Sequence, residues 1–71
     1  MTIKEADMEK TNLQKARLEA GMSQSQLAAK AGISLRTLQH YEIGDRDIRK
    51  AAIETGLRIA DALGCDINKI I

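Results

Sequence analysis

Residues 23–44 read SQSQLAAKAGISLRTLQHYEIG, and they contain two short segments in which apolar residues recur at helical spacing. Ser23 and Ser34 precede these segments, where a serine side chain can accept a hydrogen bond from a free backbone N–H of the first helical turn. A glycine follows each segment, as is common where a helix ends. The stretch therefore predicts helices over about residues 24–31 and 35–42, joined by a tight turn.

The apolar residues of this stretch predict how the two helices pack. Leu38 and Tyr41 are three residues apart in the second helix and so share its inward face. In the first helix the residues expected to face inward are Leu27, Ala28 and Ala31. Ala28 is expected where the helices cross, because a small side chain lets their backbones approach. A second helix held in this way can lie in the major groove of DNA while the first braces on the DNA backbone.

The outward face of the second helix carries side chains that can read base edges, namely Leu35, Arg36, Gln39 and His40. Arginine can bind guanine O6 and N7, glutamine can pair with adenine N6 and N7, and an apolar side chain can contact the thymine methyl group. Double-stranded DNA is therefore the partner that this pair of helices predicts.

Another helix is predicted before the pair. Thr11 and Gln14 have the spacing of a capping box, and the helix that they begin is expected to end at Gly21. The residues expected to face inward are Leu13, Ala16 and Ala20, with Leu18 exposed.

A fourth helix is predicted after a polar loop over residues 45–51, under which Ile48 is expected to pack. This helix starts without a capping side chain, because Ala52 offers no oxygen, and it is expected to end at Gly64. The residues expected to face inward are Ile53, Leu57, Ala60 and Leu63.

The last residues predict a short fifth helix capped by Asp66. Its isoleucines leave two alternatives open, since Ile70 and Ile71 could complete the core or form a dimer seam. Cys65, just before it, is expected to be a small buried apolar residue rather than a redox sensor.

Composition supports a single all-α domain of five short helices over residues 11–71, preceded by a polar tail or partial helical extension over residues 1–10. The chain has 71 residues and lacks proline, phenylalanine and tryptophan, and most of its apolar residues are leucine, isoleucine, alanine and methionine, which suit small helical cores. No apolar run approaches the roughly 20 residues that span a membrane, and the first residues do not form a signal peptide. A cytoplasmic protein with no membrane partner is therefore expected.

Catalysis is not expected from this sequence. It contains one cysteine and one histidine, and no nucleophile–base pair, metal-ligand cluster or phosphate-binding loop stands at a readable spacing. We expect no enzyme activity, no metal, no cofactor and no small-molecule ligand. The formal net charge is only +1, which is small for a nucleic-acid-binding domain, although residues 21–50 contain five basic residues against three acidic ones.

With these features in view, residues 13–71 resemble the Cro/repressor-type (Xre family) helix-turn-helix domain of phage and bacterial regulators. The resemblance covers more than three-quarters of the chain. The matching pieces are Leu13, Ala16-Arg17, Gly21-Met22-Ser23-Gln24, Leu27-Ala28, Ala31-Gly32-Ile33-Ser34, Thr37-Leu38, Tyr41-Glu42-Ile43-Gly44, Glu54-Thr55, Leu57, Ile59-Ala60 and Ala62-Leu63-Gly64.

The resemblance implies a lambda-repressor-like fold, with the helix-turn-helix formed by the second and third helices, and a role as a transcriptional repressor. It also implies roles for individual residues. Base contacts would fall to Leu35, Arg36, Thr37, Gln39 and His40. Phosphate contacts would fall to Gln24, Ser34 and Arg46. Arg17 of the first helix would pair with Glu42 at the end of the third.

Two questions stay open at this point. The loop from Gly44 to Ile53 is longer than in the shortest phage repressors and carries Asp45 and Asp47, so it is open which of its basic residues reach DNA. Because the charge excess is small, a homodimer on a two-fold DNA site is expected. The alternative function is a protein-interaction module, such as an antitoxin or adaptor that uses the same helix-turn-helix surface.

Overall fold

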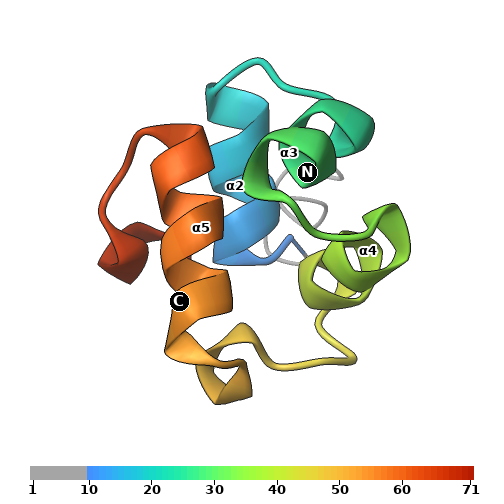
Figure 1. Ribbon diagram of the computed structural model, residues 1–71, viewed down its shortest axis with the longest axis vertical. Coiled ribbons are helices and arrows are strands. Elements are labelled where there is room, and N and C mark those ends of the chain that lie inside the picture. Colours follow the sequence, from blue (N-terminus) through green and yellow to red (C-terminus); the bar gives the residue numbers. More distant parts are fainter. Residues whose placement is uncertain (1–9) are drawn as a thin grey trace, which may run out of the picture.

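The computed structural model describes residues 10–71, and within them the chain is all-helical (Figure 1). The elements are α2 (Asn12–Glu19), α3 (Gln24–Ala31), α4 (Leu35–Ile43), η1 (Ile48–Lys50), α5 (Ile53–Leu63) and η2 (Ile67–Lys69), where η marks a single 3₁₀ turn. The all-α prediction is confirmed. The predicted tail lies outside the described residues except for Lys10.

The last of the five predicted helices does not form as an α-helix. Residues 67–69 form the 3₁₀ turn η2, because the N–H groups of Lys69 and Ile70 bond to carbonyls three residues earlier. This tight turn brings Ile70 into the core with 1% exposure and leaves Ile71 42% exposed. Ile70 therefore belongs to the core. None of the helices in the described part of the chain is long and apolar enough to cross a membrane.

Side-chain caps stand at the helix starts that the sequence predicts, although the full capping box forms at Ser23 and not at Thr11 as predicted. Thr11 accepts from the backbone N–H of Gln14, and Ser34 accepts from that of Thr37. Ser23 forms a full capping box, because the N–H of Gln26 donates to its hydroxyl and its own N–H donates to the Gln26 side chain. These local bonds explain why α3 and α4 begin where they do.

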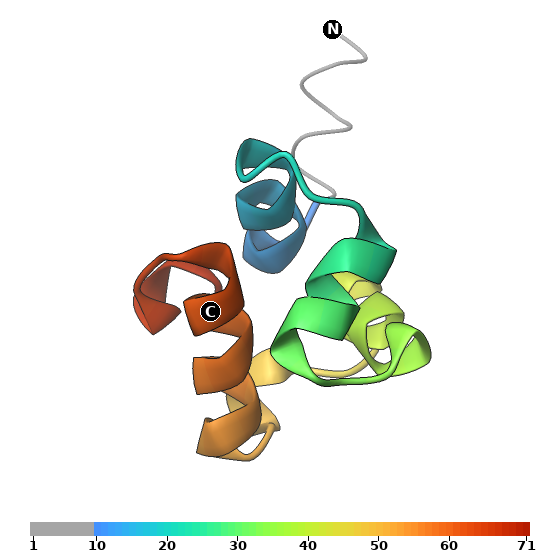
Figure 2. The ribbon, with the colours of Figure 1, turned by 45° about the horizontal axis from the view of Figure 1, so that its top comes forward.

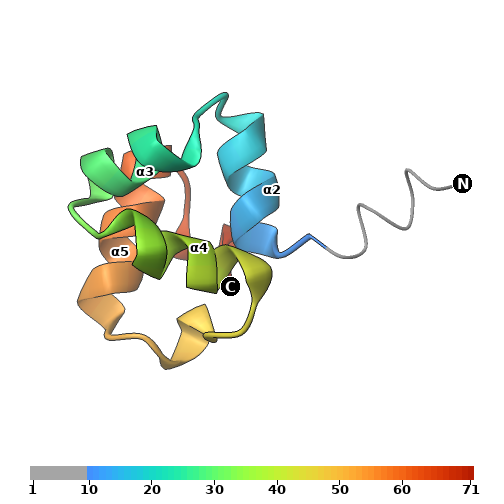
Figure 3. The ribbon, with the colours of Figure 1, turned by 90° about the vertical axis from the view of Figure 1, so that its right-hand side faces the viewer.

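The core lies where α3 packs against both α4 and α5, while α2 packs against α4 and η2. Figure 2 shows the orange α5 beside the green α3–α4 pair, and Figure 3 shows α4 lying across the front of the view between α2 and α5. The largest fully buried apolar side chains come from α2, α3, α4 and α5 and from the residue that follows η2: Leu13, Leu27, Leu38, Ile59 and Ile70. The helix pair is therefore held from behind, and one side of α4 stays exposed.

The prediction for the inward face of α5 is wrong, because the buried side of the helix is rotated away from Ile53 and Leu57. Ile53 and Leu57 are 75% and 51% exposed, whereas the buried residues are Gly56, Ile59, Ala60 and Ala62. The physical reason is the packing of η2, because a Cβ atom at Gly56 would lie 3.0 Å from Ile67 Cδ1. A bare glycine lets Ile67 approach α5 on that side, and the helix turns Gly56 and Ile59 toward the core instead of Ile53 and Leu57.

The predictions for the burial of other single residues are partly confirmed. Ala60 is buried as predicted, and Leu18 is 47% exposed as predicted. Ala20, predicted to face inward, is exposed because α2 ends at Glu19, one residue earlier. Ile48, Leu63 and Cys65 are half-buried and pack against the core.

Candidate nucleic-acid interface

The exposed side of α4 carries a polar stripe. Arg36 and Gln39 are exposed there, and they lie on the opposite side of the helix from Leu38 and Tyr41, which are 0% and 7% exposed. Leu35, at the first position of α4, is 40% exposed. An arginine, a glutamine and a leucine thus stand next to one another on the exposed side of α4.

Thr37 and Ser34 lie at the start of α4 and bind each other. The Ser34 hydroxyl accepts from the Thr37 backbone N–H at 3.0 Å and donates to Thr37 Oγ1 at 2.7 Å. Thr37 is only half-exposed. Because its oxygen already accepts from Ser34, the groups of Thr37 that can still contact a ligand are its hydroxyl proton and its methyl group. The cap therefore orders the first turn of the helix.

A buried ion pair joins the first helix of the described chain to the end of α4. Arg17 Nε lies 2.6 Å from Glu42 Oε2, and Arg17 Nη2 donates to Glu42 Oε1 at 3.1 Å, which makes the pair bidentate. Arg17 Nη1 also donates to the carbonyl of Met22 at 2.8 Å. Glu42 is 1% exposed and Arg17 8% exposed, so the structure brings these two residues together inside the domain.

Hydrogen bonds continue from this pair to the surface. Gln24 Nε2 donates to Glu42 Oε1 at 3.0 Å, and Gln39 Nε2 donates to Gln24 Oε1 at 3.3 Å. The Glu42 carboxylate thus orients the first residue of α3, and Gln24 in turn contacts the exposed stripe of α4. One of the two amide protons of Gln24 is used by Glu42, which leaves the other for an outside acceptor.

His40 is held by the loop that follows α4. Its Nδ1 atom lies 3.0 Å from both carboxylate oxygens of Asp45. When the imidazole is neutral and Nδ1 donates to Asp45, Nε2 is an acceptor, and protonation converts Nε2 into a donor. Asp45 is therefore occupied within the domain and also sets which edge of His40 faces outward.

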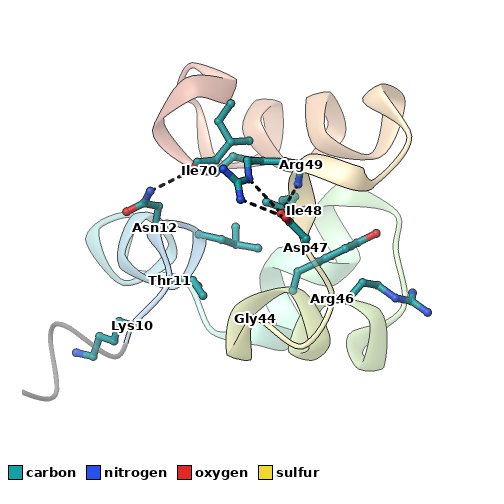
Figure 4. A pocket seen from close by; sticks show the side chains of 12 residues that line it. Lys10, Thr11, Asn12, Gly44, Arg46, Asp47, Ile48, Arg49 and Ile70 are labelled. Carbon is teal, nitrogen blue, oxygen red and sulfur yellow. Dashed lines mark hydrogen bonds and ion pairs between the residues drawn. The ribbon is translucent and has the colours of Figure 1, made fainter.

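The second acidic residue of the loop is also paired. Asp47 caps η1 by accepting from the Arg49 N–H at 2.9 Å, and Arg49 Nη2 lies 3.2 Å from Asp47 Oδ2. The side-chain hydrogen bond from Arg49 holds the pKa of Asp47 below its usual range. Figure 4 shows this pair beside an open hollow of about 460 Å³ between the start of α2 and the loop, with the Arg46 side chain directed away from it.

The basic residues of the loop therefore differ. The guanidinium of Arg49 is bound to Asp47, whereas Arg46 is exposed and forms no ion pair with the described residues. The Arg46 backbone N–H donates to the carbonyl of His40 at 3.3 Å, which keeps this residue close to the end of α4. Of these two arginines, Arg46 is the one with a guanidinium available to a phosphate.

One exposed residue of this face was not predicted. Ile43 is 70% exposed at the last position of α4, four residues after Gln39 and seven after Arg36, and so shares their stripe. The predicted end of the helix, Glu42, is one residue too early. Counting back from Gly44, whose φ of +86° ends the helix, would have included Ile43.

Comparison of the chain with known proteins gives one match, to a protein family. A protein-family model described as helix-turn-helix matches residues 13–70, which is nearly the whole described chain. Neither the curated proteins nor the solved structures gave a significant match.

Proposed function

Because the chain belongs to the Cro/repressor-type helix-turn-helix family, a family of DNA-binding regulatory domains rather than of enzymes, we propose that it is a sequence-specific repressor that reads the major groove with α4. A repressor of this type acts by occupying promoter DNA, and we place that action in the cytoplasm.

The observation that carries the proposal is the exposed stripe of α4. Arg36 is assigned a guanine, because its guanidinium forms no ion pair with the described residues and can bind two acceptors side by side. Gln39 is assigned an adenine and Leu35 a thymine methyl group. His40 and Thr37 are assigned to adjoining base edges. His40 would contact them through Nε2, and Thr37 through its hydroxyl and methyl groups.

Phosphate contacts on either side would set the position of α4 in the groove. Gln24 would use its remaining amide proton, and the Glu42 carboxylate supports this by holding the rest of the amide in place. Ser34 would contact the backbone at the start of α4, and Arg46 would contact it from the loop.

Two copies are needed for useful affinity. One domain offers a single reading helix, and the formal net charge is only +1, so few phosphates can be neutralised by one copy. We therefore propose a homodimer on a two-fold site, with half-sites about one helical turn, roughly 34 Å, apart.

A second candidate is a protein-interaction module such as an antitoxin or adaptor. It is favoured by the apolar residues that border the stripe, since Leu35 is 40% and Ile43 70% exposed on the same face. Leu18, 47% exposed on α2, adds to the exposed apolar surface. Such a partner would bind the α4 face and be little affected by salt.

The test is selection of the full chain against a pool of random duplex DNA, followed by sequencing of the retained molecules. A two-fold motif is expected. Arg36→Ala should weaken binding to that motif by about 1–3 kcal/mol and relax one base position in each half-site. Lys30→Ala is the matched control, because it removes one exposed positive charge from α3 rather than α4. It should keep the motif unchanged.

Equal losses on selected and random DNA in Arg36→Ala would contradict base reading by this residue. No enriched motif at low salt would favour the protein-interaction module. A reporter gene with the selected site overlapping its promoter then tests repression, and the proposal requires that expression falls.

A further inference from the structure

The loop after α4 turns back onto the last turn of that helix. Gly44 has a φ of +86°, a left-handed conformation that reverses the chain directly after Ile43. The carbonyl of His40 accepts from the backbone N–H of Gly44 at 3.1 Å and from that of Arg46 at 3.3 Å. Asp45 stands between these two anchored residues, so the backbone itself places its carboxylate beside the His40 ring.

The contact between Asp45 and His40 fixes where the proton of a neutral imidazole lies. His40 Nδ1 is 3.0 Å from both carboxylate oxygens of Asp45. Because an ionised carboxylate can only accept hydrogen bonds, Nδ1 must be the nitrogen that carries the proton. The other nitrogen, Nε2, then has a lone pair and no proton. The neutral ring therefore offers an acceptor, and no N–H donor, to any partner outside the domain.

His40 stands on the side of α4 that is proposed to read DNA. It follows Arg36 by four residues, about one helical turn, so the two side chains lie on the same side of the helix. The side chain of His40 is 37% exposed even with Asp45 bound to Nδ1. With Nδ1 turned to the loop, Nε2 is the ring nitrogen available to a base.

Few base edges can satisfy such an acceptor. In the major groove the amino groups of adenine and cytosine donate hydrogen bonds, whereas guanine N7 and O6 and thymine O4 only accept them. An acceptor that faces another acceptor across a closed interface leaves both groups unpaired, which costs binding free energy. Nε2 of a neutral His40 therefore suits an amino group and is unfavourable beside guanine O6 or thymine O4.

We propose that Asp45 is a specificity-determining positioning residue, which acts through His40 rather than by contact with DNA. By holding the proton on Nδ1, it makes His40 select adenine or cytosine on the strand that His40 contacts. The inference rests on the proposed function and adds to it the class of base read at one position. It also gives the acidic residue beside the reading helix a role that a basic residue could not fill.

NMR of the full chain, prepared without a histidine tag, tests the tautomer in the absence of DNA. His40 is the single histidine of the sequence, so long-range ¹H–¹⁵N correlations of its ring need no further assignment. Spectra are recorded at about pH 8, where the imidazole of a free histidine is neutral. The wild type should show a protonated Nδ1 and an unprotonated Nε2.

Asp45→Asn should change that spectrum, because an amide can either donate to Nδ1 or accept from it and so permits both tautomers. The matched control is Asp47→Asn. It removes the same charge from the same loop, but Asp47 binds Arg49 rather than His40, and asparagine can still cap η1. The tautomer in Asp47→Asn should be that of the wild type.

DNA selection at the same pH tests the consequence for base reading. His40→Ala identifies the position that His40 contacts, as the one whose preference is lost. At that position the wild type should prefer adenine or cytosine about fivefold over guanine or thymine, which corresponds to one net hydrogen bond. Asp45→Asn should reduce this preference below about twofold, and Asp47→Asn should keep it. Both variants lose one negative charge and should bind all duplexes more tightly, so affinity alone does not decide the result.

A double variant separates action through His40 from a direct effect of Asp45. Once His40 is alanine, adding Asp45→Asn should change no base preference, because there is no ring left to orient. A further change in base preference in the double variant would show that Asp45 acts on DNA by another route and would overturn the inference.

Three other results would also overturn it. They are a wild-type ring protonated on Nε2, a tautomer unchanged in Asp45→Asn, and a base preference that Asp45→Asn leaves intact. Each of these can occur while the wild type still selects a DNA motif, so the proposed function would survive them. Absence of any motif in the wild type would instead refute DNA reading itself and the base assignment with it.

Discussion

Glu42→Ala should destabilise the domain severely, and the size of the effect follows from burial. Glu42 is 1% exposed and accepts hydrogen bonds from Arg17 and Gln24. Removing the carboxylate leaves the guanidinium of Arg17 buried with only the Met22 carbonyl as a partner. Breaking one partner of a buried ion pair costs about 3–5 kcal/mol. A domain of this length has a total stability of only about 4–10 kcal/mol, so most of it would be lost.

Urea and thermal unfolding followed by circular dichroism measure this loss. The melting temperature should fall by roughly 12–40 °C for a domain of this size. Glu19→Ala is the control, because Glu19 also forms an ion pair, with Lys69 at 2.8 Å, but both side chains are exposed. Its unfolding should change far less than that of Glu42→Ala, although the distance between the charged atoms is similar.

A double-mutant cycle separates the pair from its surroundings. Arg17→Met and Glu42→Leu should each be strongly destabilising alone, whereas the double variant should lose clearly less than their sum, because no buried charge is left unpaired. Losses that simply add, or a cost below about 1 kcal/mol for Glu42→Ala, would refute the role given to burial.

Three further predictions concern caps and pH. Ala52→Asp should stabilise the domain by about 1 kcal/mol in urea melts, because α5 begins with no side-chain cap, and a loss would contradict this account of the helix start. Ser23→Ala should cost about 1 kcal/mol, and Gln26→Ala should cost less; the reverse order would mean that the Ser23 hydroxyl is not the main cap. The hydrogen bond from Lys69 holds the pKa of Glu19 below its ordinary value, so the contribution of this pair is present at neutral pH and is lost as pH falls through the lowered pKa. An NMR titration should show that Lys69→Met returns the Glu19 pKa toward its ordinary value, and an unchanged pKa would exclude Lys69 as the cause.

Local sequence was enough to predict the helix-turn-helix pair. α3 spans Gln24–Ala31, and Ser23, Ser34 and the following glycines lie at the boundaries that were predicted. Caps of this kind are bonds between a side chain and a backbone group a few residues away, so they can be read from sequence alone. The exposed stripe of α4 follows from the same information, because helical spacing places Arg36 and Gln39 opposite the buried Leu38.

Tertiary structure was needed wherever an outcome depended on contacts between segments. Local spacing favoured Ile53 and Leu57 as the inward residues of α5, but the approach of Ile67 over Gly56 turned that face outward. The roles of the acidic loop residues were also undetermined until the fold placed Asp45 beside His40. Periodicity says which side chains of a helix share a face, whereas which face is buried depends on the shape of the neighbours that pack against it.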